Sequence, residues 1–184
     1  MTTVARLLLK AQLAFWGCMV VCFAVTGGGL SHNHGFSIYG GRWTTILPWA
    51  AGFVAAAYFI LRAASLLDDG DHALAQSLRV TVALLLGVLF TPDTVDAFFY
   101  DAHIVASVLL FLFEAIVGLW LVQRVHVRAV LQLYVIQIVG GIVAAMSQAQ
   151  WIGLLSPGIL VFQVSFGALL VTASTEPHTQ LETV

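Results

Sequence analysis

One apolar segment in the second half of the chain carries a stripe of polar side chains, and these are the main candidates for chemistry. At 100° per residue the six polar side chains fall within an arc of about 80° on one face of a helix. They are Asp93, Asp96, Tyr100, His103, Ser107 and Glu114. A polar stripe is costly against lipid. We therefore expect this face to meet protein or water.

Glu114 is the deepest member of the stripe, about 12 Å along the helix from Val122 at the expected cytoplasmic end. No Lys or Arg lies at this depth, and the amides nearest in depth are Gln12, Gln137 and Gln163. Without a cation, desolvation favours a neutral, hydrogen-bonded carboxylic acid. Three interpretations stay open. Glu114 could belong to a structural polar knot with the glutamines, or be a protonatable or ligand-binding residue at the floor of a cavity. It could also face lipid or lie outside the assigned span.

A Gly-rich outer loop, residues 27–42, contains a second group of polar side chains. Its His32 and His34 could join His103 and nearby aspartates in a site for a divalent metal such as zinc. The His-x-His spacing in a loop fixes no geometry. The alternative is that the loop folds its polar and aromatic residues over the outer mouth of the bundle. Cys18 and Cys22 lie within an apolar block and are interpreted as packing residues.

The composition determines which elements must position these residues. Apolar residues make up 60% of the 184-residue chain and charged residues 9%, far below the roughly 25% charged of a soluble domain. Long apolar blocks predict an all-α integral membrane protein, a bundle of about six transmembrane helices. The expected spans are 7–30, 45–67, 75–90, 103–122, 129–146 and 151–173. They form one domain, 1–173, followed by a polar tail, 174–184.

The positive charges predict the orientation. Six of the seven lie on one side of the expected spans, and only Arg42 lies on the other. The six are Arg6, Lys10, Arg62, Arg79, Arg124 and Arg128. The positive-inside rule then places both termini in the cytoplasm of a cell-membrane protein. Trp43, Trp49 and Trp151 fall near the outer boundary, where interfacial anchors are expected.

Two local patterns predict further structure. Thr91, Pro92 and Asp93 are typical of a helix start, so we expect the fourth helix to begin near Pro92. In the fifth span, Gly140, Gly141, Ala144 and Ala145 have the spacing of a close helix contact. The same face could instead dock a partner protein.

Two short stretches resemble a known family. They are residues 36–40, FSIYG, in the outer loop, and residues 101–103, DAH, on the fourth helix. With six spans and both termini inside, they are similar to the Frag1/DRAM/Sfk1 group of small membrane proteins. This resemblance implies a six-helix protein of lipid homeostasis or sorting with no settled catalytic centre.

Three functions follow from these observations. The leading one is a non-catalytic protein that binds membrane lipid or a small polar ligand in an outward-facing cavity between the first outer loop and the fourth helix. The second is a membrane-embedded, possibly metal-dependent enzyme that acts on a lipid headgroup. The third is an accessory subunit of a larger complex, with a membrane-protein partner or a second copy of the chain. A net charge of −2 gives no basic field for nucleic acid.

Overall fold

The computed structural model describes residues 1–27, 35–68, 70–91 and 96–175. Within these ranges the chain forms six α-helices and one short 3-10 helix, η1. In order they are α1 (Thr3–Thr26), η1 (Phe36–Tyr39), α2 (Ile46–Ser65), α3 (His72–Phe90), α4 (Ala97–Val125), α5 (Arg128–Gln148) and α6 (Leu155–Ala173). All six α-helices are long and apolar enough to cross a membrane. The shortest has 19 residues, about 28 Å at the helical rise, which is close to the thickness of a bilayer core. The prediction of an all-helical bundle with six helices of spanning length is confirmed.

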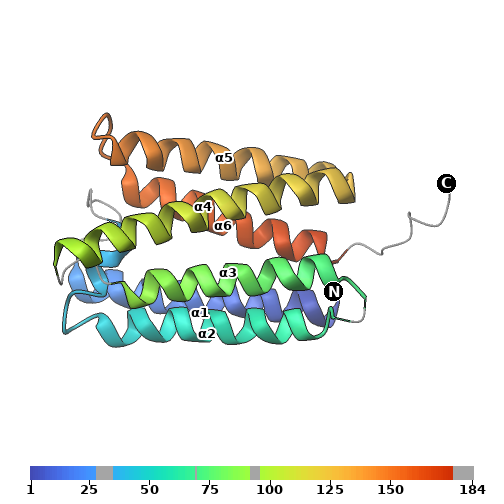
Figure 1. Ribbon diagram of the computed structural model, residues 1–184, viewed down its shortest axis with the longest axis horizontal. Coiled ribbons are helices and arrows are strands. Elements are labelled where there is room, and N and C mark those ends of the chain that lie inside the picture. The colour runs from blue at the N-terminus through green and yellow to red at the C-terminus, as the bar shows by residue number, and fades with distance from the viewer. Residues whose placement is uncertain (28–34, 69, 92–95, 176–184) are drawn as a thin grey trace.

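The six helices run side by side along the long axis of the molecule (Figure 1). Each packs against the next in the chain, and α6 packs back against α1 and α4. Helices α1, α2, α3, α4 and α6 therefore surround the interior. Helix α5 lies outside this ring, against α4 and α6.

The first turn of α1 and the last turn of α6 meet at the same end of the bundle (Figure 1). The Thr2 hydroxyl donates to the backbone carbonyl of Ser174 at 2.9 Å. Thr2 also caps α1, because its hydroxyl accepts from the Ala5 N–H at 3.1 Å. The two ends of the described chain thus lie on one side of the bundle.

The boundary between α3 and α4 differs from the expected one. Thr91 ends α3, with its hydroxyl bonded to the Gly87 carbonyl at 2.8 Å. Helix α4 starts at Ala97, and the Asp96 carboxylate caps it by accepting from the Phe99 N–H at 2.9 Å. The expected start at Pro92 falls in 92–95, outside the described residues. Asp96 serves as the N-cap because its short carboxylate reaches the free N–H groups of the first turn.

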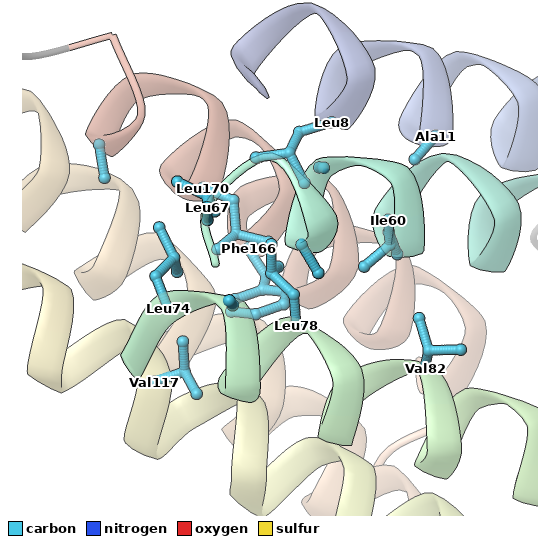
Figure 2. Close-up of a cluster of buried hydrophobic side chains, with 14 of the residues drawn as sticks. Leu8, Ala11, Ile60, Leu67, Leu74, Leu78, Val82, Val117, Phe166 and Leu170 are labelled. Atoms are coloured by element: carbon cyan, nitrogen blue, oxygen red, sulfur yellow. The ribbon is translucent and has the colours of Figure 1, made fainter. Parts of the chain in front are cut away.

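Two apolar clusters fill the bundle, one toward each end. We call the end with the two termini the inner end and the opposite end the outer end. The inner cluster lies near the termini of the chain and includes Leu8, Leu78 and Phe166, which point toward one another (Figure 2). The outer cluster lies at the opposite end. It consists of Met19, Cys22, Phe36, Tyr39, Trp49, Phe53, Val88 and Leu110.

The contact between α5 and α6 depends on small residues from both helices. A Cβ added at Gly140 would lie 2.6 Å from the backbone nitrogen of Phe162. One added at Gly158 would lie 2.5 Å from the backbone nitrogen of Ala144. The two backbones approach this closely because no side chain separates them. The predicted close helix contact is confirmed. Helix α6 covers Gly140 and Ala144, whereas Ala145 is exposed. The alternative of a docking surface for a partner stays a prediction.

Candidate functional site

A cavity of about 140 Å³ lies inside the ring of five helices, between the two apolar clusters. Helices α1, α2, α3, α4 and α6 all contribute to its wall, and α5 does not. Residues 35–37 line its outer end, whereas Leu8 and Leu170 of the inner cluster line the other end. Most of the wall is apolar. The few polar groups in it therefore determine what chemistry the cavity offers.

Two polar side chains in the wall, Glu114 and Gln163, are bonded to each other. Glu114 is only 2% exposed, and the Gln163 amide donates to its carboxyl oxygen Oε2 at 2.8 Å. The bond links α4 to α6. Gln163 was one of the three amides matched to Glu114 by depth, and the structure brings these two together. A buried carboxyl group with an amide partner is satisfied without a counter-ion.

Gln12 of α1 lines the same cavity. Its carbonyl accepts from the indole N–H of Trp16, one turn further along α1, at 3.1 Å. The amide lies directly on Gly167 of α6, where an added Cβ would overlap it. Gly167 lies one turn beyond Gln163, so the two glutamines occupy neighbouring levels of the wall. A glycine at this position leaves space for the amide against the helix backbone.

The third amide, Gln137, does not reach the cavity. It is fully buried between α4 and α5, where a Cβ added at Gly118 would lie 2.7 Å from its Oε1 atom. Neither of its amide atoms has a hydrogen-bond partner among the described residues. Gly118 continues the polar face of α4 by one turn beyond Glu114. The structure therefore divides the predicted amide set between two interfaces.

His103 and Ser107 line the cavity on the outer side of Glu114. His103 is buried, and its Nδ1 lies 2.7 Å from the carbonyl oxygen of Thr91. Because a carbonyl only accepts, Nδ1 must carry the proton in this bond, and a neutral ring then has Nε2 as an acceptor. The bond also ties the first turns of α4 to the end of α3.

The remaining members of the predicted stripe lie elsewhere. Asp96 is exposed and caps α4, and Tyr100 is 46% exposed. Neither lines the cavity. Asp93 lies outside the described residues. Of the predicted stripe, His103, Ser107 and Glu114 therefore line the cavity. Asp96 and Tyr100, at the start of α4, are exposed instead.

The metal hypothesis depends on residues that the structure does not describe, because His32 and His34 fall in 28–34. Among the residues it does describe, no three His, Cys, Asp or Glu side chains gather closely enough to hold an ion. The third predicted ligand, His103, engages Thr91. The three-histidine site stays a prediction.

The described end of the outer loop packs over the outer cluster. The Phe36 ring lies edge-on to Trp16, with centroids 5.8 Å apart, and contacts Phe23. The Tyr39 carbonyl accepts from the buried Thr45 hydroxyl at 2.8 Å. Burial raises the pKa of the Tyr39 phenol above its ordinary value. These contacts fix one wall of the outer end of the cavity.

Sequence reasoning missed the role of Trp49. It was interpreted as an interfacial anchor, yet its side chain is 3% exposed and lines the cavity. Its indole N–H has no partner among the described residues. Trp43 and Trp151, by contrast, are strongly exposed. The signal was present in the spacing of Trp49, Phe53 and Ile60, which places all three on one face of α2.

An ion pair at the inner end was also missed. Asp71 caps α3 by accepting from the Leu74 N–H at 3.2 Å. Its other oxygen bonds Arg124 of α4 at 2.6 Å. Arg124 in turn lies over the Trp120 ring, 5.0 Å from its centroid. The pair fastens α3 to α4 beneath the cavity.

Comparisons with protein-family models, with curated proteins and with solved structures give no match to this chain. The class of protein is therefore defined by its own fold and site. It is a bundle of six candidate membrane spans, five of which enclose a mainly apolar cavity with a carboxyl–amide pair in its wall.

Proposed function

We propose that this protein is a non-catalytic, multi-pass protein of the cell membrane that holds a lipid or a small polar ligand in the cavity between its five enclosing helices. The observation that carries the proposal is the Glu114–Gln163 pair in the wall of that cavity. An intramembrane ionisable group is a functional hypothesis by default. A mainly apolar cavity with a few polar groups has the character of a small-molecule site.

The engagement of the polar groups supports binding rather than catalysis. The carboxyl group of Glu114 bonds an amide, and the imidazole of His103 bonds a backbone carbonyl. Each is thereby held in one orientation. Fixed groups of this kind orient a ligand in a largely preformed pocket.

The distribution of charge supports an orientation with the cavity open toward the outer side. Residues 35–37 line the end of the cavity farthest from the termini, and the inner cluster lies at its other end. The end with the termini also has the Asp71–Arg124 pair and most of the positive residues. By the positive-inside rule, that end is cytoplasmic. Both termini are then inside, in agreement with the resemblance to the Frag1/DRAM/Sfk1 group, which stays a prediction.

Native mass spectrometry of protein released from its own membrane tests the proposal. Ser107 lines the cavity, and Val108 beside it is half exposed. We expect the unaltered protein to carry a bound mass. Ser107→Phe should fill the cavity and remove that mass, whereas Val108→Phe should keep it. A protein without a bound mass, or the same mass on Ser107→Phe that is shown to be folded, would contradict the proposal.

A further inference from the structure

The size of the cavity limits what it can hold. Its volume is about 140 Å³, and one water molecule needs about 10–15 Å³ on the same measure. The cavity therefore accommodates on the order of ten non-hydrogen atoms. A two-chain phospholipid has several times that number. This volume fits a small molecule or one slim chain rather than a two-chain phospholipid.

The charges of the wall disfavour an anionic group at the polar end of that molecule. No Lys or Arg is among the described residues that line the cavity. Two arginines on the helices that carry the lining residues Thr81 and Glu114 are paired outside the cavity, Arg79 with Asp68 and Arg124 with Asp71. A buried carboxylate or phosphate would thus be left without a counter-ion, which costs several kcal/mol.

A cationic group is disfavoured by the same wall. It would require Glu114 to be ionised while only 2% exposed. The partner that the structure gives this carboxyl group is the neutral amide of Gln163. Its α1 neighbour in the wall, Gln12, is also neutral. A neutral Glu114 beside two neutral amides therefore favours an uncharged ligand.

The hydrogen bonds of the two glutamines indicate which uncharged group fits. Gln163 uses one N–H on Glu114, and Gln12 uses its oxygen on the Trp16 indole. An amide has two N–H donors and an oxygen that accepts twice. Gln12 thus offers donors, and Gln163 offers an acceptor. A group that both donates and accepts uses both sides of the wall.

From this geometry we infer that the ligand is an uncharged single-chain amphiphile, whose terminal hydroxyl or primary amide lies among Glu114, Gln163 and Gln12. Its chain contacts the apolar wall of the cavity, which includes Phe53 and Leu110. The inference rests on the proposed binding function and adds the chemical class of the ligand.

A matched set of eight-carbon compounds tests the inference. The protein, in nanodiscs of a neutral lipid, is photolabelled with octanol that carries an alkyl diazirine. Octanol, octanamide, octane, octanoate and octylammonium then compete at near-neutral pH, each compared at equal mole fraction in the bilayer. We expect octanol and octanamide to suppress labelling of cavity residues at least about tenfold more effectively than the other three.

Variants at Glu114 sharpen the result. Glu114→Gln retains a group that donates and accepts, so competition by octanol should stay within about threefold of the unaltered protein. Glu114→Leu should weaken it by about tenfold or more. The control is Ile116→Leu, two residues away on the exposed face of α4, which should change nothing. The series on the unaltered protein decides the question even where the Leu variant does not fold.

The outcomes separate the inference from the proposed function. Equal competition by octane and octanol, or strongest competition by octanoate or octylammonium, would overturn the inference while ligand binding in the cavity stands. Absence of labelling in the cavity, with the bound mass of the native protein still sensitive to Ser107→Phe, would also overturn only the inference. Absence of both signals would overturn the two together.

Discussion

The amide of Gln163 donates to the carboxyl group of Glu114 at 2.8 Å, and this bond joins α6 to α4 inside the bundle. The two residues are 49 positions apart in the chain. Both side chains line the cavity. At this depth in a bilayer, lipid would offer neither of them a hydrogen-bond partner. The pair therefore has two consequences: it stabilises the helix contact, and it places a polar group where a ligand can reach it.

The first prediction concerns the energy of this pair. Gln163→Leu leaves the Glu114 carboxyl group buried without its amide partner, so the free energy of unfolding should fall by about 1–3 kcal/mol. Glu114→Leu combined with Gln163→Leu removes both partners and should recover part of that loss. Unfolding in mixed micelles measures all the variants. Strictly additive losses for the two single variants would show that the bond contributes nothing.

The second prediction compares three glycines. A Cβ at Gly158 would lie 2.5 Å from the Ala144 backbone nitrogen, which cannot move aside. Gly158→Ala should therefore lower the free energy of unfolding by about 3 kcal/mol or more. At Gly167 the added Cβ meets the flexible amide of Gln12, so the loss should be nearer about 1 kcal/mol. It should be relieved by Gln12→Ala.

Gly17 is the control for this series. It is exposed on α1 and has no atom within 4 Å of an added Cβ. Gly17→Ala should raise stability by about 0.5–1 kcal/mol, because alanine favours the helix. The same thermal or denaturant unfolding assay applies. A loss at Gly167 as large as that at Gly158 would contradict the described position of Gln12.

The third prediction contrasts two ion pairs near the termini. Arg124 bonds Asp71, whose side chain is 5% exposed, whereas Arg79 bonds Asp68 with both side chains more than a third exposed. Arg124→Gln should lower the free energy of unfolding by about 1–3 kcal/mol. Arg79→Gln should change it by less than about 1 kcal/mol. Equal losses would mean that Asp71 is not buried as described.

The fourth prediction concerns orientation. In a background with Cys18→Ala and Cys22→Ala, single cysteines replace Trp43 and His72, which are exposed at opposite ends of the bundle. An impermeant maleimide added to intact cells should label Trp43→Cys and spare His72→Cys until the membrane is opened. The reverse pattern would place both termini outside and contradict the positive-inside assignment.

Particular residues show how far the sequence predicts the structure. The six spans follow from long apolar blocks, because a bilayer leaves few alternatives to a helix. Depth along the helices correctly selected Gln163 as a partner for Glu114. It could not separate Gln163 from Gln137, since depth says nothing of which helix faces which. The neighbours of each helix depend on long-range contacts: α6 packs against α1 and closes the ring, and α5 packs mainly against α4 and α6.

The outer end was harder to predict for a related reason. Trp49 is compatible with an interfacial anchor by its position along the chain. It is buried because it packs in the outer cluster, where a Cβ added at Gly40 would lie 2.9 Å from its ring. The strong helix-start signal near Thr91 competed with the end of α3, where the same hydroxyl bonds the preceding turn. A local motif of this kind suits either the end of one helix or the start of the next. The contact of His103 with Thr91 is a tertiary contact, which the local sequence does not predict.

The most direct test of the central claim is an experimental density map of the protein in nanodiscs of its native lipid. We expect one elongated feature inside the ring of α1, α2, α3, α4 and α6, in contact with Glu114 and Gln163. A map in which these helices close with no feature between them, or in which α4 turns Glu114 toward lipid, would contradict it.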